Sequence, residues 1–172
     1  LGIGSNISST FGNRFQNIDL AISLIEEKNI KVIKKSSYYE TPSYPDKKKP
    51  KYINIVVVVE TNLEIADLIS AIISIEEKLE RKRGKKNDPR TCDIDIIDYK
   101  SKKFDFEYKN LKFFIPHKEL VNRNFVLFPL QEVAPDWKHP INNEFVDSLI
   151  NKLSSDDKKS ILKIVKSWYK YK

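Results

Sequence analysis

Two aspartates separated by one residue, Asp93 and Asp95, are the feature of this sequence that most directly suggests chemistry. Their neighbours Cys92, Ile94 and Ile96 are apolar, which predicts a strand whose side chains alternate between two faces. Both carboxylates then project from one face, and burying them together is unfavourable unless a cation compensates. Magnesium prefers carboxylate oxygens and often shares its ligands with phosphates, so the pair predicts a metal site. The alternative is an exposed strand face paired with nearby lysines.

A dense group of basic residues precedes the two aspartates. It consists of Arg81, Lys82, Arg83, Lys85, Lys86 and Arg90. Such a run is often only a solvated surface. Beside two carboxylates, however, arginines suit the neutralisation of phosphate oxygens, because their forked donors match phosphate geometry. The sequence has no Walker phosphate-binding loop, which excludes the P-loop class. The pattern therefore indicates metal-assisted phosphoryl-type transfer.

Tyr52 and Asn54 alternate with apolar residues in a segment rich in β-branched side chains. This pattern predicts a central strand with both polar side chains on one face. An aromatic ring and an amide in that arrangement suit a planar heterocycle. They are equally consistent with a tyrosine that covers the sheet and an amide bonded within the protein.

A second polar segment contains His117, Arg123 and Phe125. A histidine and an arginine close together suit an anionic ligand, and the aromatic ring suits a planar one. A lone histidine is also common in purely structural positions.

The elements that must position these residues follow from hydrophobic periodicity. Strands are predicted at 1–3, 31–41, 52–61 and 92–99, and a hairpin at 104–114. One helix is predicted at 15–28 with Asn13 as its cap, and a second extends to residue 79 with Thr61 or Asn62 as its cap. This order predicts an α+β, ferredoxin-like βαββαβ core, with an antiparallel sheet and both helices on one face. Further helices are predicted at 143–153 and 155–169. We expect one domain over residues 1–153 and a basic helical tail over 154–172, which packs Ile161, Leu162 and Val165 on that domain.

The composition restricts the classes of function. The 172 residues carry a net charge of +7, which favours polyanionic partners such as nucleic acid, an anionic membrane or phosphate-rich small molecules. One cysteine excludes an internal disulfide and a multi-cysteine zinc site, which suits the cytoplasm. No apolar run is long enough to span a bilayer, and the first residues do not form a signal peptide. Since the sequence contains no methionine, we expect Leu1 to lie inside a strand.

The sequence resembles the 6-hydroxymethyl-7,8-dihydropterin pyrophosphokinase family. Four stretches carry the resemblance, and together they extend to about Pro135. They are Gly4-Ser5-Asn6; Thr41-Pro42 followed by Tyr52-Ile53-Asn54; Pro89-Arg90-Thr91-Cys92-Asp93-Ile94-Asp95; and Pro116-His117 with Asn122-Arg123, Phe125 and Pro129-Leu130-x-Glu132-x-Ala134-Pro135. The ferredoxin-like core of the family agrees with the predicted order of elements.

The resemblance implies transfer of pyrophosphate from ATP to 6-hydroxymethyl-7,8-dihydropterin, with release of AMP, in folate biosynthesis. It implies that Asp93 and Asp95 hold two Mg²⁺ ions and that Arg81 and Arg90 are catalytic. The implied pterin site consists of Thr41, Pro42, Tyr52, Asn54 and Phe125. The implied ATP site consists of Arg83, Ile96, His117 and Arg123.

The resemblance also concerns partners and loop closure. Members of the family are often joined to other folate-pathway enzymes, so the resemblance allows fusion to or association with such an enzyme. Nucleic acid and membranes are not expected as partners.

Asn87-Asp88 stand where the family usually has Trp-Gly. Closure of this loop over the site is therefore expected to differ in detail.

Two other interpretations fit part of the sequence. An RNA-binding module shares the same core and suits the basic charge, but the aromatic RNA-binding signature is missing and an acidic pair on the sheet would repel phosphate. The second interpretation is a non-catalytic domain within a folate-enzyme fusion. The complete set of aspartates and arginines argues against it.

Overall fold

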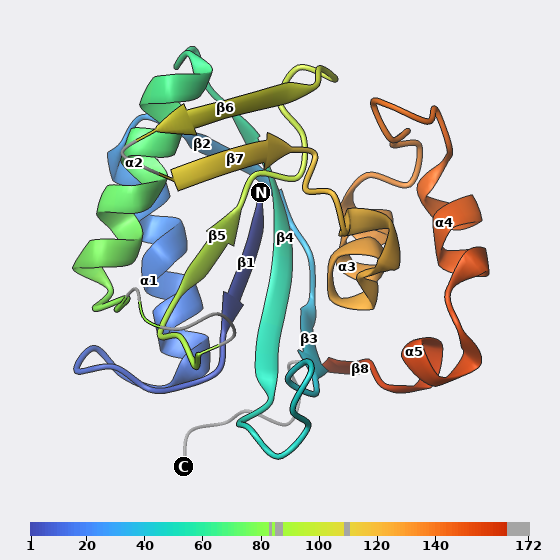
Figure 1. Ribbon diagram of the computed structural model, residues 1–172. Helices are drawn as coiled ribbons and strands as arrows, with labels where there is room; N and C mark the ends of the chain where they lie inside the picture. The colour runs from blue at the N-terminus through green and yellow to red at the C-terminus, as the bar shows by residue number, and fades with distance from the viewer. Residues whose placement is uncertain (83, 85–87, 109–110, 165–172) are drawn as a thin grey trace.

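The computed structural model describes residues 1–82, 84, 88–108 and 111–164. At its centre lies an antiparallel sheet with the strand order β5-β1-β4-β3-β8, in which β2 also pairs with β4 (Figure 1). The strands of this sheet are β1 (Gly2–Ser5), β2 (Lys31–Lys35), β3 (Tyr38–Thr41), β4 (Tyr52–Glu60), β5 (Asp93–Asp95) and β8 (Leu162–Ile164). A separate hairpin consists of β6 (Phe104–Tyr108) and β7 (Leu111–Ile115). The predicted hairpin is thereby confirmed.

Two helices, α1 (Arg14–Glu27) and α2 (Ile65–Lys78), cover one face of the sheet (Figure 1). Their apolar stripes pack on Ile3, Ile55 and Ile94 in a continuous core. As predicted, Asn13 caps α1, and it forms a capping box with Gln16. The predicted α+β arrangement, with both helices on one face, is confirmed.

The start of α2 differs slightly from the prediction. The helix begins at Ile65, so its N-cap is Glu64 and not Thr61 or Asn62, and Glu64 makes no side-chain capping hydrogen bond. Thr61, one of the two expected caps, instead accepts a hydrogen bond from the Leu63 amide at 3.1 Å. This local bond holds a turn before the helix rather than its first turn.

The opposite face of the sheet is only partly covered. Helices α3 (Asn124–Val133) and α4 (Val146–Lys152) form a second core over Val56 and Ile97, next to the short 3₁₀ helix η1 (Leu120–Asn122). Figure 1 shows α3 and α4 on the β3 side of the sheet. Helices α3 and α4 leave uncovered the part of this face that is formed by β1, β5 and the start of β4.

The predicted helix over residues 155–169 is wrong for its described part. Helix α5 covers only Ser155–Lys159, and the chain then forms β8, which pairs with β3. Leu162, expected to pack on the domain, is 62% exposed. Pairing satisfies the backbone groups of β3, which a helix at this place would leave open. Residues 165–172, including Val165, lie outside the described residues, and the boundary after residue 153 stays a prediction.

The predicted strand over residues 92–99 is also shorter in the structure, where β5 covers only Asp93–Asp95.

Among the described residues, no helix is both long enough and apolar enough to cross a bilayer.

Candidate active site

The uncovered part of the sheet brings the two predicted polar groups onto one face. Gly4 of β1 lies opposite Asn54 of β4 on one side and opposite Asp93 of β5 on the other. Residues directly opposite one another in neighbouring strands share a face. Gly2, two residues earlier, likewise lies opposite Asp95. The two aspartates and Asn54 therefore face the same way, as the alternation of residues predicts.

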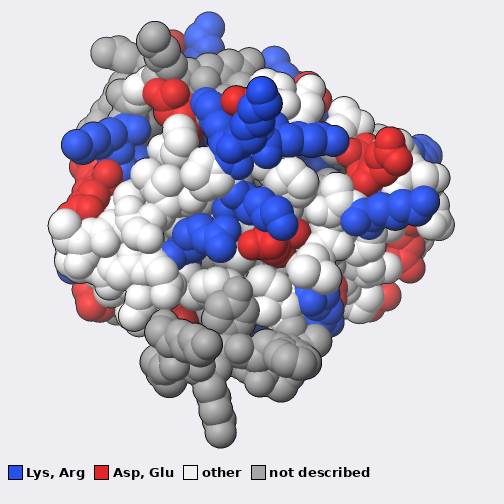
Figure 2. Space-filling model, turned by 90° about the horizontal axis from the view of Figure 1, so that it is seen from below, with Lys and Arg blue, Asp and Glu red and all other residues white. Residues whose placement is uncertain are grey.

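Two arginines hold the carboxylate of Asp93. Arg81 Nη1 lies 2.7 Å from Asp93 Oδ1, and Arg90 forms an ion pair with the other carboxylate oxygen. Arg81 follows the end of α2 and Arg90 lies in the loop before β5, so the structure brings these predicted residues together from separate elements. Figure 2, seen from below, shows Lys and Arg side chains beside Asp and Glu side chains on this side of the molecule.

Asp95 belongs to a second polar group with Arg123 and His117. Arg123 Nη1 lies 3.4 Å from Asp95 Oδ2, and its Nη2 lies 3.2 Å from His117 Nε2. Burial, and then the neighbouring Arg123, lower the pKa of His117. The ring of Phe125 lies 5.6 Å from the Arg123 guanidinium carbon, which places this aromatic beside the same group.

The surroundings of Asp95 favour a bound cation. Although 42% of its side chain is exposed, the surrounding protein and the charge of Asp93 raise the pKa of Asp95 above its usual range. A cation beside both carboxylates would relieve this unfavourable charge. The described residues include no group of three or more His, Cys, Asp or Glu side chains that could hold a metal ion. Two carboxylates on one strand face suit a magnesium ion that takes its remaining ligands from phosphate and water.

A small recess joins residues expected around the nucleotide. It is lined by Asp95, Ile96, Ile97, His117, Leu120, Arg123 and Val126. Ile96, His117 and Arg123 were predicted as ATP-binding residues, so the structure places these three around one recess. Arg83, the fourth predicted residue, lies outside the described residues.

The predicted pterin residues lie mainly at the start of β4 and the end of β3. Asn54 Nδ2 donates a hydrogen bond to Thr41 Oγ1 at 3.0 Å, and both residues are buried. Burial raises the pKa of Tyr52, and the charges of Arg90 and Asp93 also act on its hydroxyl group. The tyrosine thus lies within electrostatic reach of the arginine and aspartate group. Pro42 follows Thr41 and is half-buried.

This arrangement was compared with known proteins. A family model described as 7,8-dihydro-6-hydroxymethylpterin-pyrophosphokinase (HPPK) matches residues 1–135. The chain belongs to this family. The family expected from the sequence is thereby confirmed, and the match favours an enzyme over the RNA-binding alternative.

Relatives in this family include single enzymes and fusions. The chain is 33% identical to the 2-amino-4-hydroxy-6-hydroxymethyldihydropteridine pyrophosphokinase of Synechocystis, over 89% of the chain and 74% of the relative. It is 34% identical to the folic acid synthesis protein fol1 of Schizosaccharomyces pombe, over 90% of the chain but 20% of the relative. The chain thus spans only about one fifth of the length of fol1.

A solved structure supports the fold of this family member. The crystal structure of Plasmodium falciparum HPPK-DHPS with pteroate matches 88% of this chain and 41% of the other chain. The TM-score is 0.65 at 18% sequence identity, so this likeness concerns the fold alone.

Sequence reasoning missed Glu76, which supports the candidate active site from α2. This carboxylate is 2% exposed, accepts a hydrogen bond from the Ile94 amide at 2.8 Å and forms an ion pair with Arg81. It therefore connects α2 to the strand segment between the two aspartates. Its signal in the sequence was a carboxylate placed among the apolar residues of a helix, where only a paired charge is tolerated.

Asn6, which the sequence indicated only as part of the motif Gly4-Ser5-Asn6, joins two loops of the site. Its side chain is buried; Oδ1 accepts a hydrogen bond from the Arg90 amide at 2.6 Å, and Nδ2 donates to the Pro50 carbonyl at 3.2 Å. Asn17 of α1 supports the same region by donating to the Thr91 carbonyl at 3.1 Å. Buried amides on either side thus fix the backbone around Arg90.

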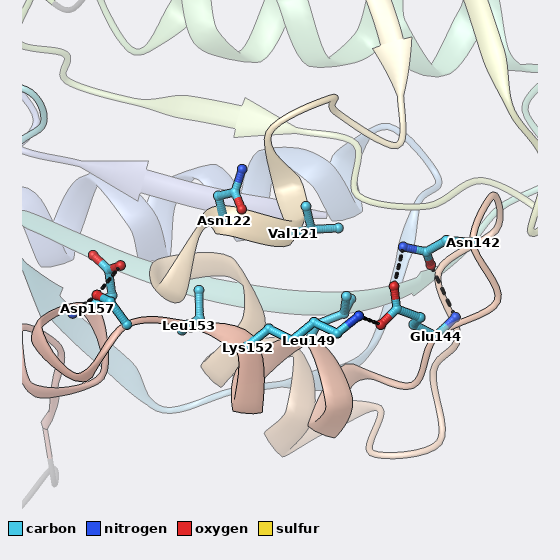
Figure 3. Close-up of a pocket in the computed structure, with 9 residues that line it drawn as sticks. Val121, Asn122, Asn142, Glu144, Leu149, Lys152, Leu153 and Asp157 are labelled. Carbon is cyan, nitrogen blue, oxygen red and sulfur yellow. Dashed lines mark hydrogen bonds and ion pairs between the residues drawn. The ribbon is translucent and has the colours of Figure 1, made fainter.

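A separate cavity of about 270 Å³ lies beside η1, α4 and α5 (Figure 3). Its lining residues are Val121, Asn122, Asn142, Glu144, Leu149, Lys152, Leu153, Ser154 and Asp157. Lys152 and Glu144 form an ion pair with each other, and none of the predicted site residues lines this cavity. It is therefore not the candidate active site.

Proposed function

We propose that this chain transfers pyrophosphate from ATP to 6-hydroxymethyl-7,8-dihydropterin and releases AMP. The observation that carries the proposal is the row Asn54, Gly4 and Asp93 across three adjacent strands. The row puts Asn54 and Asp93 on one face with only a glycine between them, which supports binding of a pterin beside a phosphate group. The hydroxymethyl oxygen forms a bond to the β-phosphorus of ATP, the bond from that phosphorus to the α,β-bridging oxygen breaks, and AMP leaves with that oxygen.

In this proposal Asp93 and Asp95 hold two Mg²⁺ ions. Bound magnesium neutralises charge on the phosphate oxygens and helps to align them for transfer. Arg81 and Arg90 donate hydrogen bonds to the transferred group and stabilise charge that develops in the transition state. The proposal assigns Asp93 and Asp95 to the metal ions and His117 to the nucleotide, so it includes no protein general base, and the hydroxyl proton passes to water.

The two substrates occupy neighbouring parts of the face. The pterin binds against Tyr52 and Asn54, with Thr41, Pro42 and Phe125 completing its site. The nucleotide binds along Ile96, His117 and Arg123, with Arg83 as a further contact. The lowered pKa of His117 supports this assignment, because a neutral imidazole beside Arg123 remains available as a hydrogen-bond partner at neutral pH.

We further propose a cytoplasmic location, which is supported by a single cysteine, Cys92, that is a buried free thiol. A fused or associated folate-pathway enzyme is also proposed. Support comes from relatives such as the bifunctional protein FolKE of Lactococcus lactis, of which the chain covers 38% at 38% identity.

The reaction is tested by incubating the chain with ATP, Mg²⁺ and 6-hydroxymethyl-7,8-dihydropterin, and separating the nucleotide products. We expect AMP and a pterin diphosphate in equal amounts, and neither when the pterin or Mg²⁺ is omitted. Formation of ADP would indicate a kinase of the ordinary type. No pterin-dependent product, together with salt-sensitive RNA binding, would favour the RNA-binding module instead.

A further inference from the structure

A run of three lysines, Lys47-Lys48-Lys49, lies in the loop that connects β3 to β4, residues 42–51. We call this segment the lysine loop. Lys47 and Lys48 are exposed. The backbone turns at this place, since the Asp46 side chain accepts a hydrogen bond from the Lys48 amide at 2.9 Å. The two exposed lysines are thus presented to solvent from a defined turn.

The lysine loop and the loop that contains Arg90 enter the sheet at the same end. Strand β1 is antiparallel to both β4 and β5, so the starts of β4 and β5 lie together. The lysine loop directly precedes Tyr52 of β4, and Arg90 precedes Asp93 of β5. Figure 1 shows the connection between β3 and β4 at the lower end of the sheet, and Figure 2, which views the molecule from below, shows Lys and Arg side chains there. The lysines therefore share one end of the molecule with the proposed phosphate-binding arginines.

The base of the lysine loop is fixed beside the site. Asn6 Nδ2 donates a hydrogen bond to the Pro50 carbonyl at 3.2 Å, and Asn6 Oδ1 accepts one from the Arg90 amide at 2.6 Å. Lys51, at the end of the loop, pairs with Glu40 of β3 at 3.0 Å. These contacts hold the base of the loop in place, and the two exposed lysines lie beyond it at the tip.

The two substrates differ in charge. ATP with bound Mg²⁺ is an anion, whereas the dihydropterin alcohol carries no ionised group at neutral pH. Fixed charges beside a binding site raise the association rate of a ligand of opposite charge. Salt limits the range of this effect, to about 10 Å at 0.1 M ionic strength. Exposed lysines at the end of the sheet where the site lies should thus act on the nucleotide and not on the pterin.

We propose that Lys47 and Lys48 steer the nucleoside triphosphate into the site by long-range electrostatic attraction, an inference that rests on the proposed function. The two lysines accelerate the encounter of the triphosphate with the arginines that hold it. They make no contact with the bound nucleotide. They therefore raise the association rate constant and leave the dissociation rate constant unchanged.

The test measures nucleotide association by stopped-flow fluorescence, with a fluorescent non-hydrolysable ATP analogue and Mg²⁺. Lys47→Gln combined with Lys48→Gln removes both charges and keeps the backbone hydrogen bond of the turn. At about 20 mM ionic strength we expect the association rate constant to fall about three- to tenfold. At about 300 mM the difference from wild type should shrink to less than about twofold. The dissociation rate constant should stay within about twofold of wild type at both salt concentrations.

Lys28→Gln combined with Lys31→Gln is a charge-matched control. Both lysines are exposed, and Lys28 follows α1 on the covered face of the sheet. Lys31 lies opposite Glu60, which is roughly 26 Å along β4 from Tyr52 at the other end of the strand. This control changes the net charge by the same amount. Its association rate constant should stay within about twofold of wild type at low salt.

Two further measurements separate charge from loop conformation. Lys47→Arg combined with Lys48→Arg keeps both charges and should bind the analogue at the wild-type rate. Association of 6-hydroxymethyl-7,8-dihydropterin should be the same in every variant. The proposal is overturned if removal of the two charges leaves nucleotide association unchanged at low salt. It is also overturned if the loss persists at high salt, appears in the arginine variant or the control, or lies mainly in faster dissociation.

AMP release by the wild-type protein is measured separately. Its absence, together with salt-dependent association that needs the two lysines, would reject the proposed reaction alone. Normal AMP release, with association that does not depend on the lysines, would reject the steering alone.

Discussion

Asp93 is the residue on which the two arginines and the proposed metal site meet. Its carboxylate pairs with Arg81 and Arg90 in the free protein. Binding of magnesium and a triphosphate would replace these pairs with contacts from the arginines to phosphate. Asp93 therefore keeps both cations in place before the substrate arrives.

We predict that Asp93→Ala and Asp95→Ala each lower the rate of AMP release by at least about a hundredfold, because each change removes a metal ligand. Circular dichroism should show an unchanged fold. Calorimetric titration with Mg²⁺ and an ATP analogue checks the loss of metal-dependent binding. Near-normal turnover of both variants would contradict the metal assignment.

Arg90 is expected to act mainly in the transition state. We predict that Arg90→Ala lowers kcat by about 10²–10³-fold, while affinity for the pterin changes much less. Steady-state kinetics with a separate pterin-binding measurement distinguish the two effects. Lys152→Ala is a suitable control, since Lys152 is an exposed cation that pairs with Glu144 beside the separate cavity. A defect of Arg90→Ala confined to affinity would argue against this function.

At this scale, the sequence predicted residues whose pattern is local. Strand alternation was enough to place Asp93 and Asp95 on one face. Glu76 escaped notice because its partners, Arg81 and the Ile94 amide, come from the end of α2 and from β5. Such a pairing depends on how the elements pack and not on spacing within one of them.

Among the elements, α3 is joined to two strands through Glu132. Its carboxylate accepts hydrogen bonds from the Ser37 amide at 3.1 Å and the Tyr39 hydroxyl at 2.7 Å, and it pairs with Lys163 of β8 at 3.3 Å. Burial opposes ionisation here, but the hydrogen bonds from Tyr39 and Ser37 outweigh it and lower the pKa of Glu132. One side chain thus holds α3, β3 and β8 together.

We predict that Glu132→Ala lowers the free energy of unfolding by about 1–3 kcal/mol, because it leaves the partly buried Ser37 and Tyr39 donors without their acceptor. Glu132→Gln keeps an acceptor oxygen and should lose less. Urea denaturation of the three proteins measures the difference. Equal stability of Glu132→Ala and wild type would show that water replaces the carboxylate without cost.

The same elements show where prediction from sequence fails. Helix α2 was recognised because its apolar residues repeat over several turns. In the C-terminal segment, Leu162 and Ile164 fit either periodicity over so short a length, and lysines favoured the helix. The outcome was decided by the open edge of β3, which is a property of the assembled sheet.

For the whole molecule, both histidines affect how stability depends on pH. Burial lowers the pKa of His117 and of His139 below 6.5. The unfolded chain then binds protons more readily than the folded protein just below pH 6.5. Their contribution to stability is thus fully present above that pH and is lost as the pH falls through the lowered values. The raised pKa of Asp95 acts in the opposite direction, since the folded protein accepts that proton more readily.

We therefore predict that His117→Gln reduces the loss of unfolding free energy between about pH 7.5 and about pH 5.5. His139→Gln should do so as well, and Asp95→Asn should make the loss steeper. Chemical denaturation at each pH gives the slopes. A slope unaffected by either histidine substitution would contradict the lowered pKa values.

The buried amide of Asn6 has a mechanical consequence. It bonds at once to the Arg90 backbone and, through Pro50, to the stretch that leads into Tyr52. Displacing either stretch without the other breaks a hydrogen bond shielded from water, at a cost of about 1–3 kcal/mol. Opening and closing around the two substrates is thereby favoured as a single joint movement over two independent ones.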